Sequence, residues 1–305
     1  MPRKTWVVTT AMPGADGPSV EANLEKASNL LARACSGRPD TICLPEVYAT
    51  MGVAYERADT VAQPVPGPIT DTVAAFARRY STYIICPLLE ARRGSLHNSA
   101  VLLDRQGQVA GVYEKIHPVP GADGSTLERG LDSGPGPKVF DTDFGRIGIL
   151  ICFDINWAEE WAALKRMGAE IVFWPSAYEG GLPLQSRALD HHYVVVSSTT
   201  MYHSRMIDIT GRVLAETGTY SDIAEGEIDL EKRLLSTDWN LDKVPAIRAK
   251  YGRDVTMQML LVEDMMTLQS ERPDLTVAAI VQEFGLEYWE DYIARCTEAQ
   301  ARRRR

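Results

Sequence analysis

Short apolar runs alternate with amphipathic stretches along most of this chain, and the pattern predicts strands interleaved with helices. Runs typical of β-strands occur at residues 6–12, 40–44, 83–90, 97–104, 108–114, 138–142, 145–152, 170–176, 194–200 and 223–230. Apolar residues at helical spacing predict helices from Ser19 to Ala34, from Thr70 to Tyr80, from Trp157 to Gly168 and over 184–192.

Two pairs of neighbouring strands predict antiparallel hairpins. Residues 97–104 and 108–114 are joined across Arg105-Gln106-Gly107, and a second hairpin turns at Thr210-Gly211. Such hairpins do not fit a purely parallel doubly wound sheet. The run 145–152 is apolar on both sides and needs cover on both of its faces. The sequence therefore predicts an α/β fold in which two sheets form a sandwich with helices on its outer faces.

The last quarter of the chain is predicted to be a helical extension. Four apolar residues of the segment 255–266 recur at helical spacing, and 275–296 reads as two short helices broken at Gly285. The four residues are Val255, Met259, Val262 and Met266. On a monomer this stripe would be exposed, so we expect it to pack on a partner subunit.

Composition and charge exclude several classes of protein. The chain of 305 residues carries 32 basic and 41 acidic residues, and a net charge of −9 argues against a nucleic-acid partner. No apolar run approaches the length of a membrane span, and the N-terminus has no signal-peptide pattern, so we expect a cytoplasmic protein without a membrane partner. Five widely spaced cysteines predict free thiols, and no Cys/His cluster has zinc spacing. We expect no metal and no cofactor.

Three strand ends carry side chains that complement one another chemically. Glu46 follows the strand TICL, Lys115 stands at the end of the strand predicted over 108–114, and Cys152 ends the apolar run GRIGILIC. A thiol of ordinary pKa is mostly protonated at neutral pH, so a nucleophilic cysteine needs a base and a nearby cation. Glu46 and Lys115 are of the right types. The sequence predicts a cysteine hydrolase that lacks a catalytic histidine.

These segments resemble a known family. LPE at Glu46, YEKIH at Lys115 and GILICFD at Cys152 are similar to the three catalytic segments of the nitrilase superfamily of carbon–nitrogen hydrolases. The likeness covers roughly residues 5 to 230. It implies a four-layer-forming αββα sandwich, a homodimer or higher homo-oligomer, and hydrolysis of amides, N-carbamoyl compounds or nitriles. We expect a catalytic domain over 1–235 and the helical extension over 236–305.

The resemblance also implies a role for each residue. Glu46 would be the general base, Lys115 the oxyanion stabiliser and Cys152 the nucleophile, while Glu128 matches a second glutamate of many members and would hold Lys115. The N–H of Phe153 is a second candidate oxyanion donor. The candidate substrate-binding residues are Phe153, Asn156, Trp157, Tyr178 and Glu179.

Alternative interpretations remain for single residues. Taken alone, Cys152 reads as a buried core thiol, the interpretation we give to Cys43 and Cys86. A Cys–His dyad that uses His117 is an alternative, but in the family that the sequence resembles the equivalent histidine is structural. We also expect His191 and His192 to be structural, at the end of a helix.

The residues after Cys152 bear on the substrate. Phe153-Asp154 stand where nitrilases have Trp-Glu, and Asn156 stands near the position where N-carbamoyl amino acid hydrolases often place arginine. An amidase acting on a small-molecule amide is therefore favoured, with an N-carbamoyl hydrolase, a nitrilase or a non-catalytic binding scaffold as alternatives. Because Asp154 and Glu179 would repel an anion, the sequence predicts a preference for neutral or cationic amides. If the substrate is anionic, Arg187 or Arg205 would be the carboxylate clamp.

Overall fold

The computed structural model describes residues 3–14 and 17–304. It divides into two compact units, and each is taken by itself. The larger unit comprises residues 6–227, and the smaller one comprises 228–304 together with 3–5. The division falls before residue 235, where the sequence analysis placed the end of the catalytic domain.

Two six-stranded sheets form the larger unit. The first has the order β12-β1-β2-β3-β4-β5, with β1 to β3 parallel and β3 to β5 antiparallel. Its strands are β1 (Lys4–Thr10), β2 (Thr41–Cys43), β3 (Tyr83–Arg92), β4 (Ser95–Leu103), β5 (Val109–Glu114) and β12 (Ile223–Asp229). The predicted hairpin around residues 105–107 is confirmed as β4 and β5.

The second sheet has the order β11-β10-β9-β8-β7-β6, and β7, β8 and β9 run parallel. Its strands are β6 (Lys138–Asp141), β7 (Arg146–Ile149), β8 (Ile171–Ser176), β9 (Val194–Thr199), β10 (Arg205–Ile207) and β11 (Val213–Glu216). Every residue of β8 and β9 is buried, as expected for central parallel strands covered on both faces.

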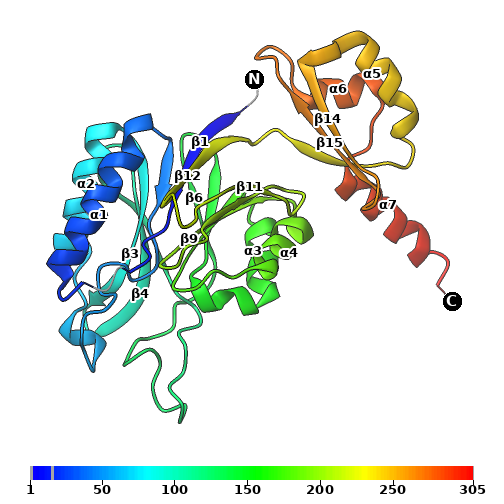
Figure 1. Cartoon of the computed structure of the whole chain (residues 1–305). Coiled ribbons are helices and arrows are strands. Elements are labelled where there is room, and N and C mark those ends of the chain that lie inside the picture. The colour runs from blue at the N-terminus through cyan, green and yellow to red at the C-terminus, as the bar shows by residue number, and fades with distance from the viewer. Residues whose placement is uncertain (1–2, 15–16, 305) are drawn as a thin grey trace. The chain divides into compact units, whose positions relative to one another are not determined.

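Helices cover the outer faces of both sheets. Figure 1 shows α1 (Val20–Ala34) and α2 (Pro68–Tyr80) outside the first sheet, and α3 (Ala158–Arg166) and α4 (Leu182–His191) outside the second. The two sheets are tied together by the Ser198 hydroxyl, which donates to the Thr10 carbonyl over 2.7 Å. The predicted αββα sandwich is confirmed.

Helix ends follow local capping rules, with one correction. The Ser19 hydroxyl accepts a hydrogen bond from the Ala22 N–H and begins α1 as expected. The helix expected to start at Thr70 instead begins at Pro68, because proline suits the first helical position and its fixed φ is already helical. Thr70 lies one turn into α2, where its hydroxyl accepts from the Gly67 N–H over 2.8 Å. Short 3-10 helices lie at η1 (Cys35–Gly37), η2 (Ala58–Thr60) and η3 (Cys152–Asn156).

The smaller unit pairs a sheet with helices. Its antiparallel sheet has the order β13-β15-β14, formed by β13 (Arg233–Ser236), β14 (Val255–Leu260) and β15 (Met265–Ser270). The helices are α5 (Val244–Tyr251), α6 (Val277–Phe284) and α7 (Trp289–Ala301), with 3-10 turns η4 (Leu241–Lys243) and η5 (Gly252–Asp254). The helical C-terminal segment is thus confirmed, and α6 ends at Gly285, whose φ of 59° is left-handed.

The stripe expected on one helix over 255–266 is wrong, because these residues form most of the β14–β15 hairpin. Met266 and Leu268 of the central strand are buried completely in a core shared with α5 and α6. Val262 lies beyond the end of β14 and is 96% exposed. Val255 and Met266 therefore belong to the unit's own core and Met259 packs against it, which removes the reason for expecting a partner subunit to cover the stripe.

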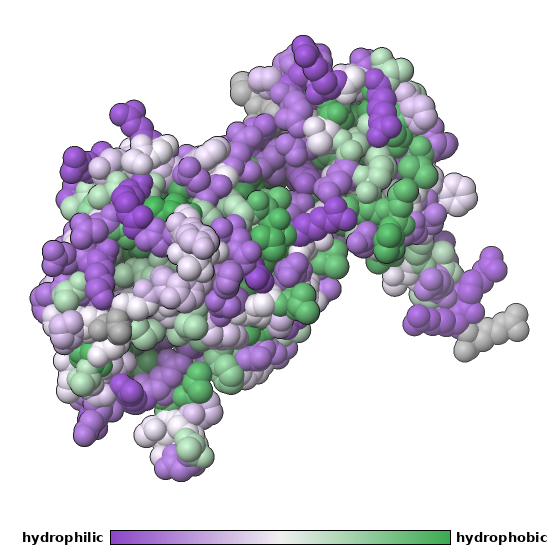
Figure 2. All heavy atoms as spheres, viewed as in Figure 1, coloured by the Kyte–Doolittle hydropathy of each residue, from purple (hydrophilic) through white to green (hydrophobic). Residues whose placement is uncertain are grey.

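The surface carries polar residues with small apolar patches between them, as the face in Figure 2 shows. Among the described residues, no helix is both long and apolar enough to cross a membrane.

Candidate active site

The three predicted reactive side chains meet in one cavity of the larger unit. Glu46 lies shortly after β2, Lys115 directly after β5, and Cys152 shortly after β7. The first two strands belong to one sheet and the third to the other, so the cavity opens where the ends of the two sheets face each other. Its volume is about 270 Å³, and Glu46, Lys115, Glu128 and Cys152 all line it.

Cys152 lies on a sharp turn from strand to helix. Its φ of +48° is left-handed, which is strained for a residue with a side chain. Two buried groups hold this turn. The Trp174 indole N–H donates to the Cys152 carbonyl over 3.0 Å, and the Asp154 carboxylate accepts from the N–H of Ile151 over 2.9 Å. The strain is thereby held in a structure that presents the thiol to the cavity.

Asp154 also ties this turn to the end of β5. Its carboxylate accepts from the Tyr113 hydroxyl over 2.7 Å and from the His117 N–H over 2.9 Å. The side chain is completely buried, and burial raises its pKa. Asp154 therefore does not face a substrate, contrary to the sequence-based argument about charge, and acts on the position of Cys152.

The Lys115 ammonium is held between two carboxylates. It donates to Glu46 Oε1 over 2.9 Å and to Glu128 Oε1 over 2.5 Å, and the side chain is only 1% exposed. The other Glu46 oxygen accepts from the Ala177 N–H over 2.8 Å. Gly134 packs against this strand end, since its N–H donates to the Lys115 carbonyl over 2.8 Å and an added Cβ would collide with the Glu114 carbonyl. These contacts fix the direction of the ammonium.

Asn98 joins the two carboxylates, and sequence reasoning missed it. Its amide Nδ2 donates to Glu46 Oε1 over 2.8 Å and to Glu128 Oε2 over 3.2 Å. Asparagine is uncommon inside strands, so its place as the second residue of the run HNSAVLL was a signal of a role beyond forming the strand.

The charges around Cys152 keep its proton in place. Burial raises the pKa of the Cys152 thiol to about 12, and the nearby Glu46 carboxylate adds to this more than Lys115 lowers it. Burial alone would lower the pKa of Lys115, but the carboxylates of Glu46 and Glu128 outweigh burial and raise the pKa. The resting site thus holds a neutral thiol beside a carboxylate and an ammonium.

The predicted substrate-binding residues are not among those that line this cavity. The Trp157 ring stacks on the His117 ring, with 3.6 Å between the ring centroids and 6° between the ring planes. The Phe153 ring meets Trp157 edge-on. Asn156 is exposed and donates to the Phe153 carbonyl over 3.0 Å. Tyr178 packs edge-on against Trp174, and Glu179 accepts from the His203 N–H over 3.3 Å. Their binding role stays a prediction. Burial raises the pKa of Tyr178 to about 12.

The remaining histidines and arginines of interest are engaged elsewhere. The His117 ring lies against Trp157 and its Nε2 is 3.5 Å from the Glu160 carboxylate, so these contacts are structural. His191 packs against the Tyr193 ring, and His192 caps the C-terminus of α4. Arg187 donates to the Ile155 carbonyl, and Arg205 pairs with Glu216.

Sequence reasoning overlooked one cation of the site. Arg129 lines the same cavity as Cys152. It follows Glu128 in the long loop between β5 and β6 that projects at the bottom of Figure 1. Within residues 3–14 and 17–304, no group of three or more His, Cys, Asp or Glu side chains is arranged to hold a metal ion.

Comparison with known proteins identifies the class. The sequence model of the carbon-nitrogen hydrolase family matches residues 10–233, and the chain belongs to this family. The protein is therefore a carbon–nitrogen hydrolase, in agreement with the predicted resemblance.

Among similar sequences, omega-amidase NIT2 of Homo sapiens is 27% identical over 69% of this chain and 84% of its own length. The deaminated glutathione amidase of Synechocystis is 26% identical over 74% of this chain and 92% of its own length.

Among solved structures, Saccharomyces cerevisiae Nit3, a member of branch 10 of the nitrilase superfamily, superimposes with a TM-score of 0.65. It is 20% identical over 82% of this chain and 96% of that one. An amidase from Nesterenkonia sp. gives a TM-score of 0.64 at 18% identity, over 74% of this chain and 90% of that one. These structures share the fold described above.

Proposed function

We propose that this hydrolase cleaves the C–N bond of a small amide through a thioester on Cys152. Glu46 acts as general base and acid, Lys115 stabilises the oxyanion, and Glu128 holds Lys115. The observation that carries the proposal is the Lys115 ammonium, bound to both carboxylates in the cavity that the thiol also lines.

Attack begins from the neutral thiol. Because the pKa of Cys152 is raised to about 12, the proton must leave as the sulfur attacks, and Glu46 accepts it. Sulfur bonds to the amide carbon, and the carbonyl oxygen becomes an oxyanion. The Lys115 ammonium and the Phe153 N–H, in the first turn of η3, are its donors, and losing one such donor costs about 10²–10³ in rate.

Collapse of this intermediate releases the nitrogen. Glu46 returns the proton to the leaving group, which departs as ammonia or a neutral amine and leaves an acyl thioester. Glu46 then takes a proton from water as the hydroxyl attacks the thioester. The acid product forms, and the proton returns to the sulfur. Lys115 keeps its charge throughout, because its two carboxylate partners raise its pKa.

Amides are favoured over the other substrates of the family. The similar sequences include an omega-amidase and a deaminated glutathione amidase. A solved amidase from Nesterenkonia sp. AN1 carries acrylamide added to its active site cysteine. N-carbamoyl compounds and nitriles are the alternative substrates, and a non-catalytic scaffold would leave the Glu46–Lys115–Cys152 arrangement without a use.

Trapping the acyl enzyme tests the proposal. A panel of amides, ureido compounds and nitriles is assayed for ammonia release, and the enzyme is then quenched during turnover of a slow amide. We expect the acyl mass on Cys152 alone by peptide mass spectrometry. Cys152→Ala should abolish turnover with an unchanged melting temperature, whereas Cys296→Ala, in α7, should behave as wild type. An adduct on Cys43 or Cys86, or activity in Cys152→Ala, would refute the assignment.

We further propose a homo-oligomer in a reducing, cytoplasmic setting. Four of the five free cysteines are buried, which suits a reducing compartment. Light scattering of the full chain measures the oligomeric state, and a monomer would contradict the first part.

A further inference from the structure

The Asn98 side chain is buried at the reactive cavity and is oriented by its two donors. It is 1% exposed and lines the cavity that holds Cys152. Its Nδ2 donates to Glu46 Oε1 and to Glu128 Oε2, which uses both amide hydrogens. Within residues 3–14 and 17–304, its Oδ1 has no hydrogen-bond partner. A buried acceptor without a partner destabilises a fold, so this amide is placed there for its donors.

The main chain of Asn98 is bound to the same group of residues. Its carbonyl accepts from the Lys115 N–H over 2.8 Å, and the Lys115 ammonium donates to Glu46 and Glu128. One residue thus holds the backbone of the lysine and, through its side chain, both partners of the ammonium. The next residue of β4, Ser99, points to the other face of the sheet, where its hydroxyl donates to a carboxylate outside this cavity.

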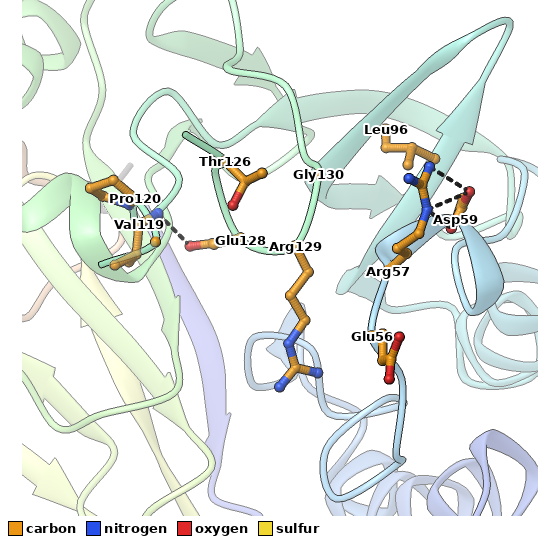
Figure 3. Close-up of a pocket in the computed structure, with 11 residues that line it drawn as sticks. Glu56, Arg57, Asp59, Leu96, Val119, Pro120, Thr126, Glu128, Arg129 and Gly130 are labelled. Carbon is orange, nitrogen blue, oxygen red and sulfur yellow. Dashed lines mark hydrogen bonds and ion pairs between the residues drawn. The ribbon is translucent and has the colours of Figure 1, made fainter. Parts of the chain in front are cut away.

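Two carboxylates share one ammonium around the Asn98 amide. Arg129 also lines the cavity, but its Nη1 donates to the Tyr55 carbonyl over 2.8 Å. Figure 3 shows Glu128 directed toward Val119, whose N–H donates to Oε1 over 2.9 Å, and Arg129 leaving the loop in another direction. Neighbouring carboxylates favour uptake of a proton by one of them unless hydrogen-bond donors stabilise both charges. Asn98 supplies one such donor to each.

The two oxygens of Glu46 have different surroundings. Oε1 accepts from both the Lys115 ammonium and the Asn98 amide, whereas Oε2 accepts from the Ala177 N–H over 2.8 Å. Burial raises the pKa of the Cys152 thiol, and a hydrogen bond from the same Ala177 N–H partly offsets this effect. Oε2 and the sulfur therefore share a neighbouring donor. An oxygen that already accepts from two donors is the poorer site for a proton, so Oε2 is the oxygen suited to take it.

Resting on the proposed function, we propose that Asn98 is a positioning residue that keeps Glu46 charged and turns its Oε2 toward the thiol. Together with Lys115 it anchors Oε1, and its second N–H stabilises the charge of Glu128. As the sulfur bonds to the amide carbon, the thiol proton passes to Glu46 Oε2, while Oε1 keeps its two donors. Asn98 acts through the carboxylates and contacts neither the sulfur nor the reacting amide.

The pH dependence of turnover reports on this role. The charged or titratable side chains that line the cavity are Glu46, Tyr55, Lys115, Glu128, Arg129 and Cys152. Tyr178 follows the lining residue Ala177. Among these side-chain types, carboxyl groups are the ones that ordinarily titrate in acid. The acid limb of kcat/KM reports the ionisation of the base in the free enzyme, so it measures how well Glu46 is kept charged.

The experiment measures kcat and KM for one amide by ammonia release, from about pH 5 to 10, so that the acid limb is covered. The enzymes are wild type, Asn98→Ala, Asn98→Asp and the control Ser99→Ala. Asn98→Ala removes both donors. Asn98→Asp keeps the shape of the side chain but replaces the donors with a third carboxylate. Ser99→Ala removes a buried donor to a carboxylate on the other face of the same strand.

In Asn98→Ala we expect kcat to fall about tenfold or more with KM nearly unchanged, because the base is no longer held in its reactive orientation. The acid limb should move to higher pH by at least about half a unit. Asn98→Asp should lose more activity than Asn98→Ala, although its shape is closer to asparagine, because the added charge raises the proton affinity of its neighbours. Ser99→Ala should keep the wild-type limb. The position of the limb does not depend on the fraction of folded enzyme, so a destabilised variant still gives the answer.

An acid limb at the wild-type position in both Asn98 variants would overturn the positioning role while the amidase function stands. A loss confined to KM would do the same, because it would make Asn98 a substrate contact. Hydrolysis of no amide by the wild type would instead overturn the proposed function, and the positioning role with it.

Discussion

At the scale of single residues, the protonation of Cys152 is the feature that decides how the reaction starts. Lys115 favours the thiolate, but burial and the Glu46 carboxylate together outweigh it and raise the pKa of the thiol to about 12. A preformed thiolate, common in cysteine enzymes with a histidine or a helix terminus nearby, is therefore not expected. In the proposed mechanism, the Glu46 carboxylate therefore acts as the base during attack.

The first prediction separates the charge of Glu46 from its role as a base. In Glu46→Gln the negative charge near the thiol is lost, so the pKa of Cys152 should fall and alkylation by iodoacetamide should accelerate at pH 8 to 9. Turnover should nevertheless fall by about 10² or more, because no base remains. Alkylation is followed by intact mass over pH 6 to 11, with Cys152→Ala identifying the site. An alkylation profile that is unchanged or moves to higher pH would contradict this account.

At the scale of elements, the smaller unit depends on its central strand β15. Met266 and Leu268 are completely buried between β13, β14 and the helices, whereas every candidate catalytic residue belongs to residues 6–227. The two units therefore carry separate cores, and damage to one core is expected to be felt first within its own unit.

The second prediction is that Leu268→Ala destabilises the smaller unit by about 2–5 kcal/mol, because it leaves a cavity in a packed core. Hydrogen exchange should show loss of amide protection in β13, β14 and β15 first, with kcat on an amide retained. Leu261 lies beside the hairpin turn and is 64% exposed, so Leu261→Ala is the matched control. It should change neither the stability of the smaller unit nor its amide protection. A parallel loss of kcat would instead show that the smaller unit contributes to a catalytic site.

At the scale of the whole molecule, buried thiols make stability depend on alkaline pH. Burial raises the pKa of Cys35, Cys86 and Cys152 to about 12 and raises that of Cys43 as well. An unfolded thiol titrates near pH 8.5. Below that pH both states keep their protons, so the contribution to stability is complete. Above it the unfolded chain releases protons that the folded chain retains, and stability is lost until the folded thiols titrate near pH 12.

The third prediction is a steady fall of the free energy of unfolding between about pH 8.5 and 11, of at most roughly 1.4 kcal/mol per pH unit for each such thiol. Urea denaturation under reducing conditions measures it. Cys35→Ala should make the slope shallower, whatever its effect on absolute stability. A free energy of unfolding that stays constant over this range would disprove the linkage.

Sequence patterns predicted most of the larger unit because its strands and helices are locally consistent. Continuous apolar runs such as 170–176 fit buried parallel strands, and the turn at Arg105-Gln106-Gly107 fits a hairpin. The smaller unit was harder, because Val255, Met259, Val262 and Met266 recur at helical spacing although three of them lie in strands and Val262 lies in the turn between the strands. Pairing of β15 with β14 on one side and with β13 on the other decided in favour of strands. Strand pairing is a contact between separate segments, which the periodicity of one segment does not reveal.

For the site, the sequence by itself determined the chemical types: a thiol, a carboxylate and an ammonium, each at a strand end, with Glu128 in the loop. Residue identity and position relative to a strand are local properties, and these were enough. Only the tertiary structure decided which neighbours tune them. Asn98 bridges two carboxylates, Asp154 turns inward to hold the turn at Cys152, and Arg129 reaches the cavity. Hydrogen-bond partners and burial come from contacts between segments that are distant along the chain. The presence of a charged side chain in a motif therefore does not tell whether that side chain faces the substrate or the core.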